Sequence, residues 1–171
     1  MTTTGSAGNW ERVGFFHFVE EFETPICALT KAIEAEQKRH PNGDISNSLI
    51  VLPEEFNLGH QHGPPAPELP PREILEKLRK ELAVPLRVTF VVGILDGRSN
   101  SAYWVDANGS ELVCHKMGDD KTGLYDRCVR NPDCKNPIVC TNAAVGVLIC
   151  MDATENEPCI QDRRNNLLAA L

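Results

Sequence analysis

The sequence lacks several features that would place it in a large class of proteins. Its 171 residues contain no run of five basic residues, and no apolar run approaches the roughly 20 residues that span a bilayer. The first ten residues lack the basic and long apolar segments of a secretory signal. The formal charge of −7 leaves no clustered lysine and arginine for phosphate binding. We therefore expect a cytoplasmic protein that binds neither membranes nor nucleic acids.

Paired-cysteine motifs are also absent. The seven cysteines are an odd number and include no Cys-x-x-Cys pair, which favours reduced thiols over a disulfide framework. Cys128, Cys134 and Cys140 are separated by five residues each, which is wider than the usual zinc-binding pairs. The composition, 42% hydrophobic and 24% charged, is that of an ordinary soluble domain. We expect a flexible N-terminus over residues 1–10 and one domain over residues 11–171.

Hydrophobic patterning in the first half of the chain predicts alternating strands and helices. The predicted strands occupy residues 12–19, 48–53 and 86–95, the predicted helices occupy 26–39 and 74–82, and a proline-rich loop occupies 57–73. The order strand, helix, strand is typical of a parallel pair of strands joined by a crossover helix. The fold class that follows is α/β.

The second half of the chain continues with a predicted hairpin. Residues 101–116 contain two strand-like runs around Asn108-Gly109, a dipeptide that favours a tight primed turn. Residues 117–137 are polar and loop-like, residues 143–150 form a predicted strand, and residues 154–171 form a closing helix. The apolar stripe of that last helix favours a homodimer if nothing else covers it.

Three chemically useful residues follow predicted strands. Glu54 follows the apolar strand 48–53, Lys116 ends the hairpin, and Cys150 ends the last strand. Ligands of α/β proteins gather outside the carboxyl ends of strands, so residues at strand ends can meet although they are far apart in sequence. Taken singly, a strand-end glutamate or lysine is usually a solvated charge, and a cysteine is usually a buried one.

Together these segments resemble the signatures of the nitrilase, or carbon–nitrogen hydrolase, superfamily. "LIVLPEEFNLG" resembles the first signature, in which an apolar strand runs into Pro-Glu. "NSAYWVDANGSELVCHK" resembles the second, a hairpin of the form Asn-x-x-x-x-Val-Asp-x-x-Gly that ends in lysine. "VGVLICMDA" resembles the third, and the gaps of 62 and 34 residues between the three also resemble the family.

The resemblance implies a role for each of the three residues. Glu54 would be the general base, Lys116 the electrophilic stabiliser and Cys150 the nucleophile. Strand alternation predicts that the adjacent Glu55 points to the opposite side, which favours Glu54. The implied reaction is hydrolysis of a small-molecule amide, in preference to a nitrile, through a thioester, and it requires no metal or organic cofactor.

The chain also departs from the family pattern in two respects. The family fold is a four-layer αββα sandwich, and this sequence stops one helix after the cysteine, so we expect the first half to two thirds of that sandwich. Members commonly carry a second glutamate between the lysine and the cysteine, but residues 117–149 contain none. Four aspartates could replace it, and spacing selects none of them: Asp119, Asp120, Asp126 and Asp133.

Two other functions remain open from the sequence. The first is a truncated, non-catalytic family member that acts as a binding or interaction protein. The second is a metal-binding domain that uses imidazole and thiolate ligands, with the candidates His60, His62, Cys128, Cys134 and Cys140.

Overall fold

The main sheet of the protein is mixed and has five strands. The computed structural model describes residues 10–17, 24–58, 70–96, 99–116, 138–140 and 144–146, together with Gln161 and Asn165. The strands lie in chain order: β1 (Arg12–Phe15), β2 (Ser48–Val51), β3 (Thr89–Asp96), β4 (Ser99–Val105) and β5 (Ser110–His115). A separate antiparallel pair consists of β6 (Ile138–Cys140) and β7 (Ala144–Gly146).

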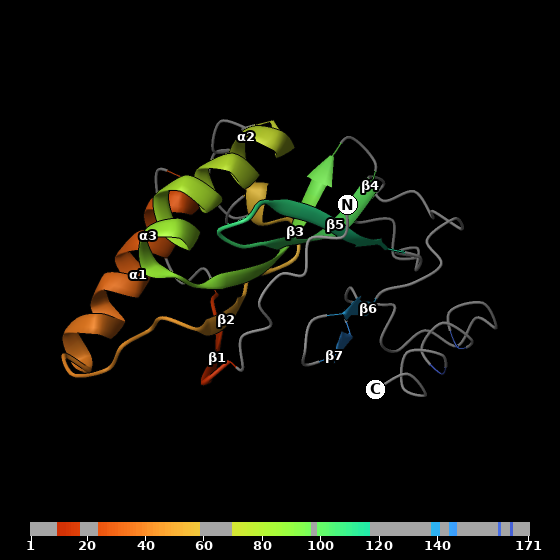
Figure 1. Ribbon diagram of the computed structural model, residues 1–171. Helices are drawn as coiled ribbons and strands as arrows, with labels where there is room; N and C mark the ends of the chain where they lie inside the picture. The colour runs from red at the N-terminus through yellow and green to blue at the C-terminus, as the bar shows by residue number, and fades with distance from the viewer. Residues whose placement is uncertain are drawn as a thin grey trace.

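The strand directions agree with the predicted crossover. β1, β2 and β3 are parallel, and β3, β4 and β5 form an antiparallel meander. The helix between β1 and β2 is α1 (Pro25–Arg39), so the prediction of a parallel pair joined by a helix is confirmed. The α/β class is confirmed as a mixed sheet with helices, which Figure 1 shows on one side of the strands.

α1 begins where the sequence supplies a cap. The side chain of Thr24 accepts a hydrogen bond from the backbone N–H of Cys27 at 3.2 Å, which satisfies one of the donors that a helix leaves unpaired at its start. Pro25 follows in the first turn, where its missing N–H costs nothing. The helix turns Ile26 and Leu29 toward the sheet, and both are buried.

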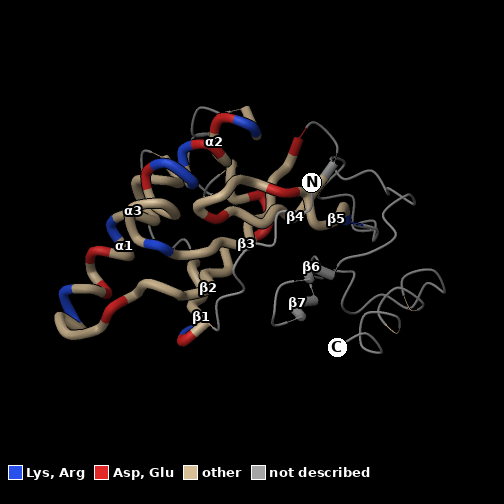
Figure 2. Tube along the Cα trace, viewed as in Figure 1, with Lys and Arg blue, Asp and Glu red and all other residues tan. Residues whose placement is uncertain are grey.

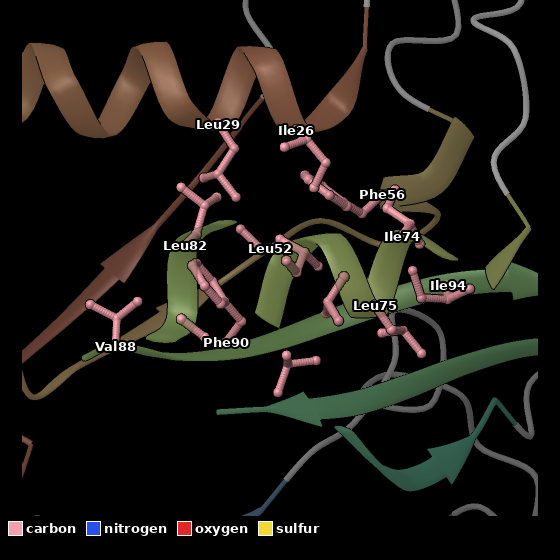
Figure 3. Packing of buried hydrophobic residues seen from close by; sticks show 14 residues of the cluster. Ile26, Leu29, Leu52, Phe56, Ile74, Leu75, Leu82, Val88, Phe90 and Ile94 are labelled. Atoms are coloured by element: carbon pink, nitrogen blue, oxygen red, sulfur yellow. The ribbon is translucent and has the colours of Figure 1, made fainter. Parts of the chain in front are cut away.

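The core lies between the helices and one face of the sheet (Figure 3). Ile26 and Leu29 of α1, Leu82 of the second helical segment, and Phe90 and Ile94 of β3 belong to one buried cluster, in which Leu82 lies between Leu29 and Phe90. All five side chains are buried, and burial of each such group contributes about 1.5–3 kcal/mol relative to leaving it in water. Packing of the helices against β3 therefore accounts for most of the described core.

The second helical segment is longer than the predicted helix 74–82. It runs through α2 (Pro71–Lys77), the π-helical η2 (Leu78–Ala83) and α3 (Val84–Leu86). Pro85 has no N–H to donate to the preceding turn, and the wider π-helical turn lies directly before it. The segment ends at Arg87, whose φ of 52° is left-handed. The strand predicted from residue 86 therefore begins three residues later, at Thr89.

The turn between β4 and β5 differs from the predicted primed turn. Val105 pairs with Ser110, so the connection is four residues long, and Asn108 is not among the described non-glycine residues with positive φ. Instead the carboxylate of Asp106 accepts hydrogen bonds from the backbone N–H groups of Asn108 at 2.7 Å and Gly109 at 3.2 Å. The Asp106 side chain thus pairs the backbone N–H groups of the turn, and Asn108 does not adopt the left-handed backbone conformation that a primed turn needs.

Charged residues of both signs alternate along the helices, whereas β2 and β3 are almost free of them (Figure 2). On the second helical segment, Glu76 accepts hydrogen bonds from Arg79 and forms an ion pair with Lys80 at 3.0 Å. These two basic neighbours lower the pKa of Glu76 to about 2. The charges therefore mark the solvated side of this helical segment.

β1 is an edge strand of the described sheet. Its side chains Val13 and Phe15 are exposed, Phe15 to 71%. A groove of about 520 Å³ lies between β1 and α1, and Phe16 and Ile33 contribute to its apolar lining. An exposed apolar edge strand can pair with another chain, and the homodimer stays a prediction.

Candidate functional site

The candidate site lies on the face of the sheet that the described helices do not cover. Successive side chains of a strand point to opposite faces of the sheet. Phe90 belongs to the core on the helix side, so the next residue, Val91, lies on the other face. Val91 pairs with Trp104 across β3 and β4, and both belong to a second buried cluster. That cluster consists of Leu49, Val91, Ala102, Trp104 and Cys114.

Glu54 reaches this face because the chain turns over β3 after β2 ends at Val51. A Cβ atom placed on Gly93 would lie 2.7 Å from the Cα of Glu54 and 3.1 Å from the carbonyl oxygen of Pro53. Only glycine at position 93 therefore lets the backbone of the two segments approach this closely. This contact fixes the height of Glu54 above the sheet.

Glu55 does not lie in the strand from which its direction was predicted. It lies beyond the end of β2 with a left-handed φ of 57°, and its side chain is buried. The sequence pattern extended the strand to residue 53, so alternation was the wrong reason for separating the two glutamates.

Lys116 reaches the same face through a β-bulge. Ala102 pairs with Cys114, but the next residue, Tyr103, pairs with Leu112, so Val113 is an extra residue on β5. Without that bulge the register set by the turn would move every later side chain of β5 to the opposite face. Lys116 follows two residues after Cys114 and therefore lies on the face of the second cluster.

Glu54 and Lys116 form a largely buried ion pair. Lys116 Nζ donates to Glu54 Oε1 at 2.7 Å, although the residues are 62 positions apart. The side chain of Lys116 is 7% exposed and that of Glu54 is 26% exposed. The arrangement puts a carboxylate that solvent can reach next to a buried cation, which is suited to proton transfer beside a developing negative charge.

The sequence did not assign a role to Asn100, yet this residue also binds the pair. Its side-chain Nδ2 donates to Glu54 Oε1 at 2.5 Å. Its backbone carbonyl accepts from the backbone N–H of Lys116 at 2.8 Å. Asn100 is the first residue of the hairpin segment that resembles the second family signature. Its position in that segment was the signal in the sequence that could have identified Asn100 as a residue of the site.

A second buried asparagine holds the end of β3 near this site. Asn57 lies in the 3₁₀ turn η1 (Phe56–Leu58), and its side chain accepts from the N–H of Leu95 at 2.9 Å and donates to the carbonyl of Leu95 at 2.8 Å. β2 has already ended there, so the amide of Asn57 replaces the peptide group of a neighbouring strand. The strand end that faces Asn100 is thereby fixed.

All but one of the remaining sequence candidates lie outside the described residues. Those outside are Cys150, the four aspartates proposed to replace the second glutamate, and the metal-binding candidates His60, His62, Cys128 and Cys134, whereas Cys140 is the last residue of β6. Within the part of the chain that the structure describes, no group of three or more histidine, cysteine, aspartate or glutamate residues could hold a metal ion.

No protein-family model matches the chain, and a search of curated proteins gives no match. Among the described helices, none has the length and apolar character needed to cross a membrane.

Proposed function

We propose that the protein is a carbon–nitrogen hydrolase of the nitrilase superfamily, with Glu54 as general base, Lys116 as electrophilic stabiliser and Cys150 as nucleophile. The observation that carries the proposal is the ion pair of 2.7 Å between Glu54 and Lys116. It joins two of the three residues that the sequence resemblance selects, and it does so across 62 positions of the chain.

The first half of the reaction forms a thioester. Glu54 takes the proton of the Cys150 thiol, and the thiolate attacks the carbonyl carbon of an amide. Negative charge develops on the carbonyl oxygen, where the ammonium of Lys116 stabilises it. The carbon–nitrogen bond then breaks, and the protonated Glu54 gives its proton to the departing ammonia or amine.

The second half of the reaction releases the acid. Glu54 takes a proton from water, and the hydroxide so formed attacks the thioester carbonyl. The carbon–sulfur bond breaks, the carboxylic acid leaves, and the sulfur of Cys150 regains its proton. The substrate class is a small-molecule amide, with a nitrile as the second choice.

The proposed αββα sandwich draws support from the second cluster. Helices cover one face of the five-stranded sheet, and the other face carries apolar side chains that include Val91 and Trp104. In a four-layer sandwich that face packs against a second sheet. The cytoplasmic location stays a prediction from the sequence.

Alkylation of cysteine tests the proposal without knowledge of the substrate. Iodoacetamide is applied across a pH series, and labelled positions are identified by mass spectrometry. We expect Cys150 to react faster than the other thiols, and Glu54→Gln and Lys116→Ala to remove that advantage. The half-buried Cys27 serves as the internal reference, because it lies on α1 outside the site.

A matched lysine variant controls for the loss of charge. Lys80→Ala removes an exposed lysine from the helical surface and should leave the labelling of Cys150 unchanged. Ammonia release from a panel of primary amides and nitriles then identifies the substrate class. Equal labelling of all accessible thiols in the wild-type protein, together with no ammonia release, would overturn the proposal and favour a non-catalytic binding protein.

A further inference from the structure

We propose that Asn100 is the positioning residue of the general base: it holds Oε1 of Glu54 together with Lys116 and so leaves Oε2 to take the proton. This inference rests on the proposed function and adds a residue to it. Asn100 Nδ2 and Lys116 Nζ donate to the same oxygen, at 2.5 Å and 2.7 Å. Within the described part of the chain, no hydrogen bond reaches Oε2 of Glu54.

Two donors on one oxygen separate the roles of the two carboxylate oxygens. A carboxylate oxygen has about two lone-pair directions, and on Oε1 both are used by donors. A proton placed on Oε1 would break one of these hydrogen bonds, whereas a proton on Oε2 leaves both intact. Hydrogen bonds to an ionised group are about twice as strong as neutral ones, so the preference for Oε2 is substantial.

Asn100 is held firmly enough to act in this way. Asn100 is 1% exposed, and it lies on β4, between β3 and β5. It pairs with Leu95 of β3, and its carbonyl accepts from the N–H of Lys116 at 2.8 Å. Asn100 therefore holds one partner of the ion pair through its side chain and the other through its backbone.

The neutral amide explains why an asparagine suits this position. A cation in place of Asn100 would put a second positive charge beside the buried ammonium of Lys116. An aspartate would place a like charge beside Glu54 and would accept hydrogen bonds instead of donating them. An amide donates without adding charge, so it fixes the direction of the carboxylate beside Lys116.

The first test is spectroscopic and needs no substrate. The side-chain amide signal of Asn100 is identified in a ¹H–¹⁵N spectrum of the full chain by its absence in Asn100→Ala. We expect one amide proton to resonate at unusually low field, because it is bound to a carboxylate. Glu54→Gln should move that proton toward the ordinary range, since the acceptor becomes neutral. A matched control, Asn108→Ala in the exposed turn at the other end of the β4–β5 hairpin, should leave it unmoved.

The second test separates positioning from folding. On an amide that the wild-type protein hydrolyses, Asn100→Ala should lower kcat by roughly 10- to 100-fold and change KM much less, as expected when a reacting group is misplaced by about 1 Å. Asn100→Asp, which keeps the shape and removes the donor, should lose at least as much. Thr24→Ala removes the cap of α1 outside the site, weakens the fold there, and should leave kcat within about threefold below its unfolding temperature.

The outcomes distinguish the two proposals. An amide signal of Asn100 that ignores Glu54→Gln, or an Asn100→Asp variant with wild-type kcat, would overturn the inference even in an active enzyme. A signal that responds to Glu54→Gln in a protein that hydrolyses no amide or nitrile would overturn the proposed hydrolase and retain Asn100 as the residue that positions Glu54.

Discussion

Replacement of Gly93 by alanine tests how the site is built. The added Cβ would lie 2.7 Å from Glu54 Cα, 3.1 Å from Pro53 O and 3.3 Å from Glu55 N. Non-bonded carbon atoms rest about 3.5–4.0 Å apart, so the backbone at Glu54 must retreat by roughly 0.8 Å or more. All three contacts are backbone atoms, and no rotation of a side chain can relieve them. The variant therefore moves the carboxylate relative to Lys116.

The expected magnitude follows from that overlap. Inserting a methyl group into a closely packed position costs about 1–3 kcal/mol, which for a chain of this size is a fall in Tm of roughly 2–12 °C. A displacement of this size at a reacting group lowers kcat by on the order of 100-fold. Thermal unfolding followed by circular dichroism measures the first effect, and hydrolysis of an amide substrate measures the second.

Gly14→Ala is the matched control for this prediction. Gly14 also lies in a strand, and a Cβ there meets no atom within 4 Å. The structure gives neither glycine a left-handed φ, so backbone strain does not distinguish the two variants, whereas steric overlap does. We expect Gly14→Ala to be neutral or to stabilise by about 0.4–1 kcal/mol. Equal Tm and equal activity for Gly93→Ala and Gly14→Ala would refute the reasoning.

Three further predictions concern single contacts. Lys116→Met should lower the free energy of unfolding, measured in urea, because it leaves Glu54 without its cation. The loss should be smaller than the roughly 3–5 kcal/mol that breaking a fully buried ion pair costs, because 26% of the Glu54 side chain is exposed. A larger loss would contradict this account. The folded-state pKa of Glu76, about 2, lies below its ordinary value of 4.5, so its stabilisation is present above pH 4.5 and is lost as the pH falls toward 2. Denaturation at several pH values should show that dependence weakened in Glu76→Gln, and an identical acid profile for both proteins would refute it. Thr24→Ala removes the cap of α1 and should cost about 1 kcal/mol in the same assay; unchanged stability would show that the hydrogen bond to Cys27 is dispensable.

Sequence patterning predicts the order of the elements in the first two thirds of the chain. The apolar run at 48–53 and the helical spacing at 26–39 are local signals, and they correspond to β2 and α1 within a few residues. Local signals do not predict where an element ends when packing against other elements determines its length. The helical segment continues past Pro85 to Leu86, which packs against the same buried cluster as the apolar residues of α2 and η2, although a propensity argument from proline alone would end it.

The sequence also selects Glu54 and Lys116, but it does not place them in contact. Glu54 follows an apolar strand and Lys116 ends the hairpin, and both positions are readable from the order of residues alone. Their distance depends on the alignment of β4 with β5, in which one extra residue, Val113, decides which face Lys116 joins. A strand pattern has a period of two and does not reveal a bulge, because the register is set by the partner strand.

The sequence by itself determined the α/β character, the parallel β1–β2 pair and the residue types available for chemistry, because these depend on local periodicity and composition. Only the tertiary structure decided that Gly93 must lack a side chain beneath Glu54 and that Asn100 donates to the carboxylate that Lys116 also binds. Both are contacts between segments about 40 or more positions apart. Their geometry follows from the packing of β2, β3 and β4 on one another, and no pattern within a single segment encodes it.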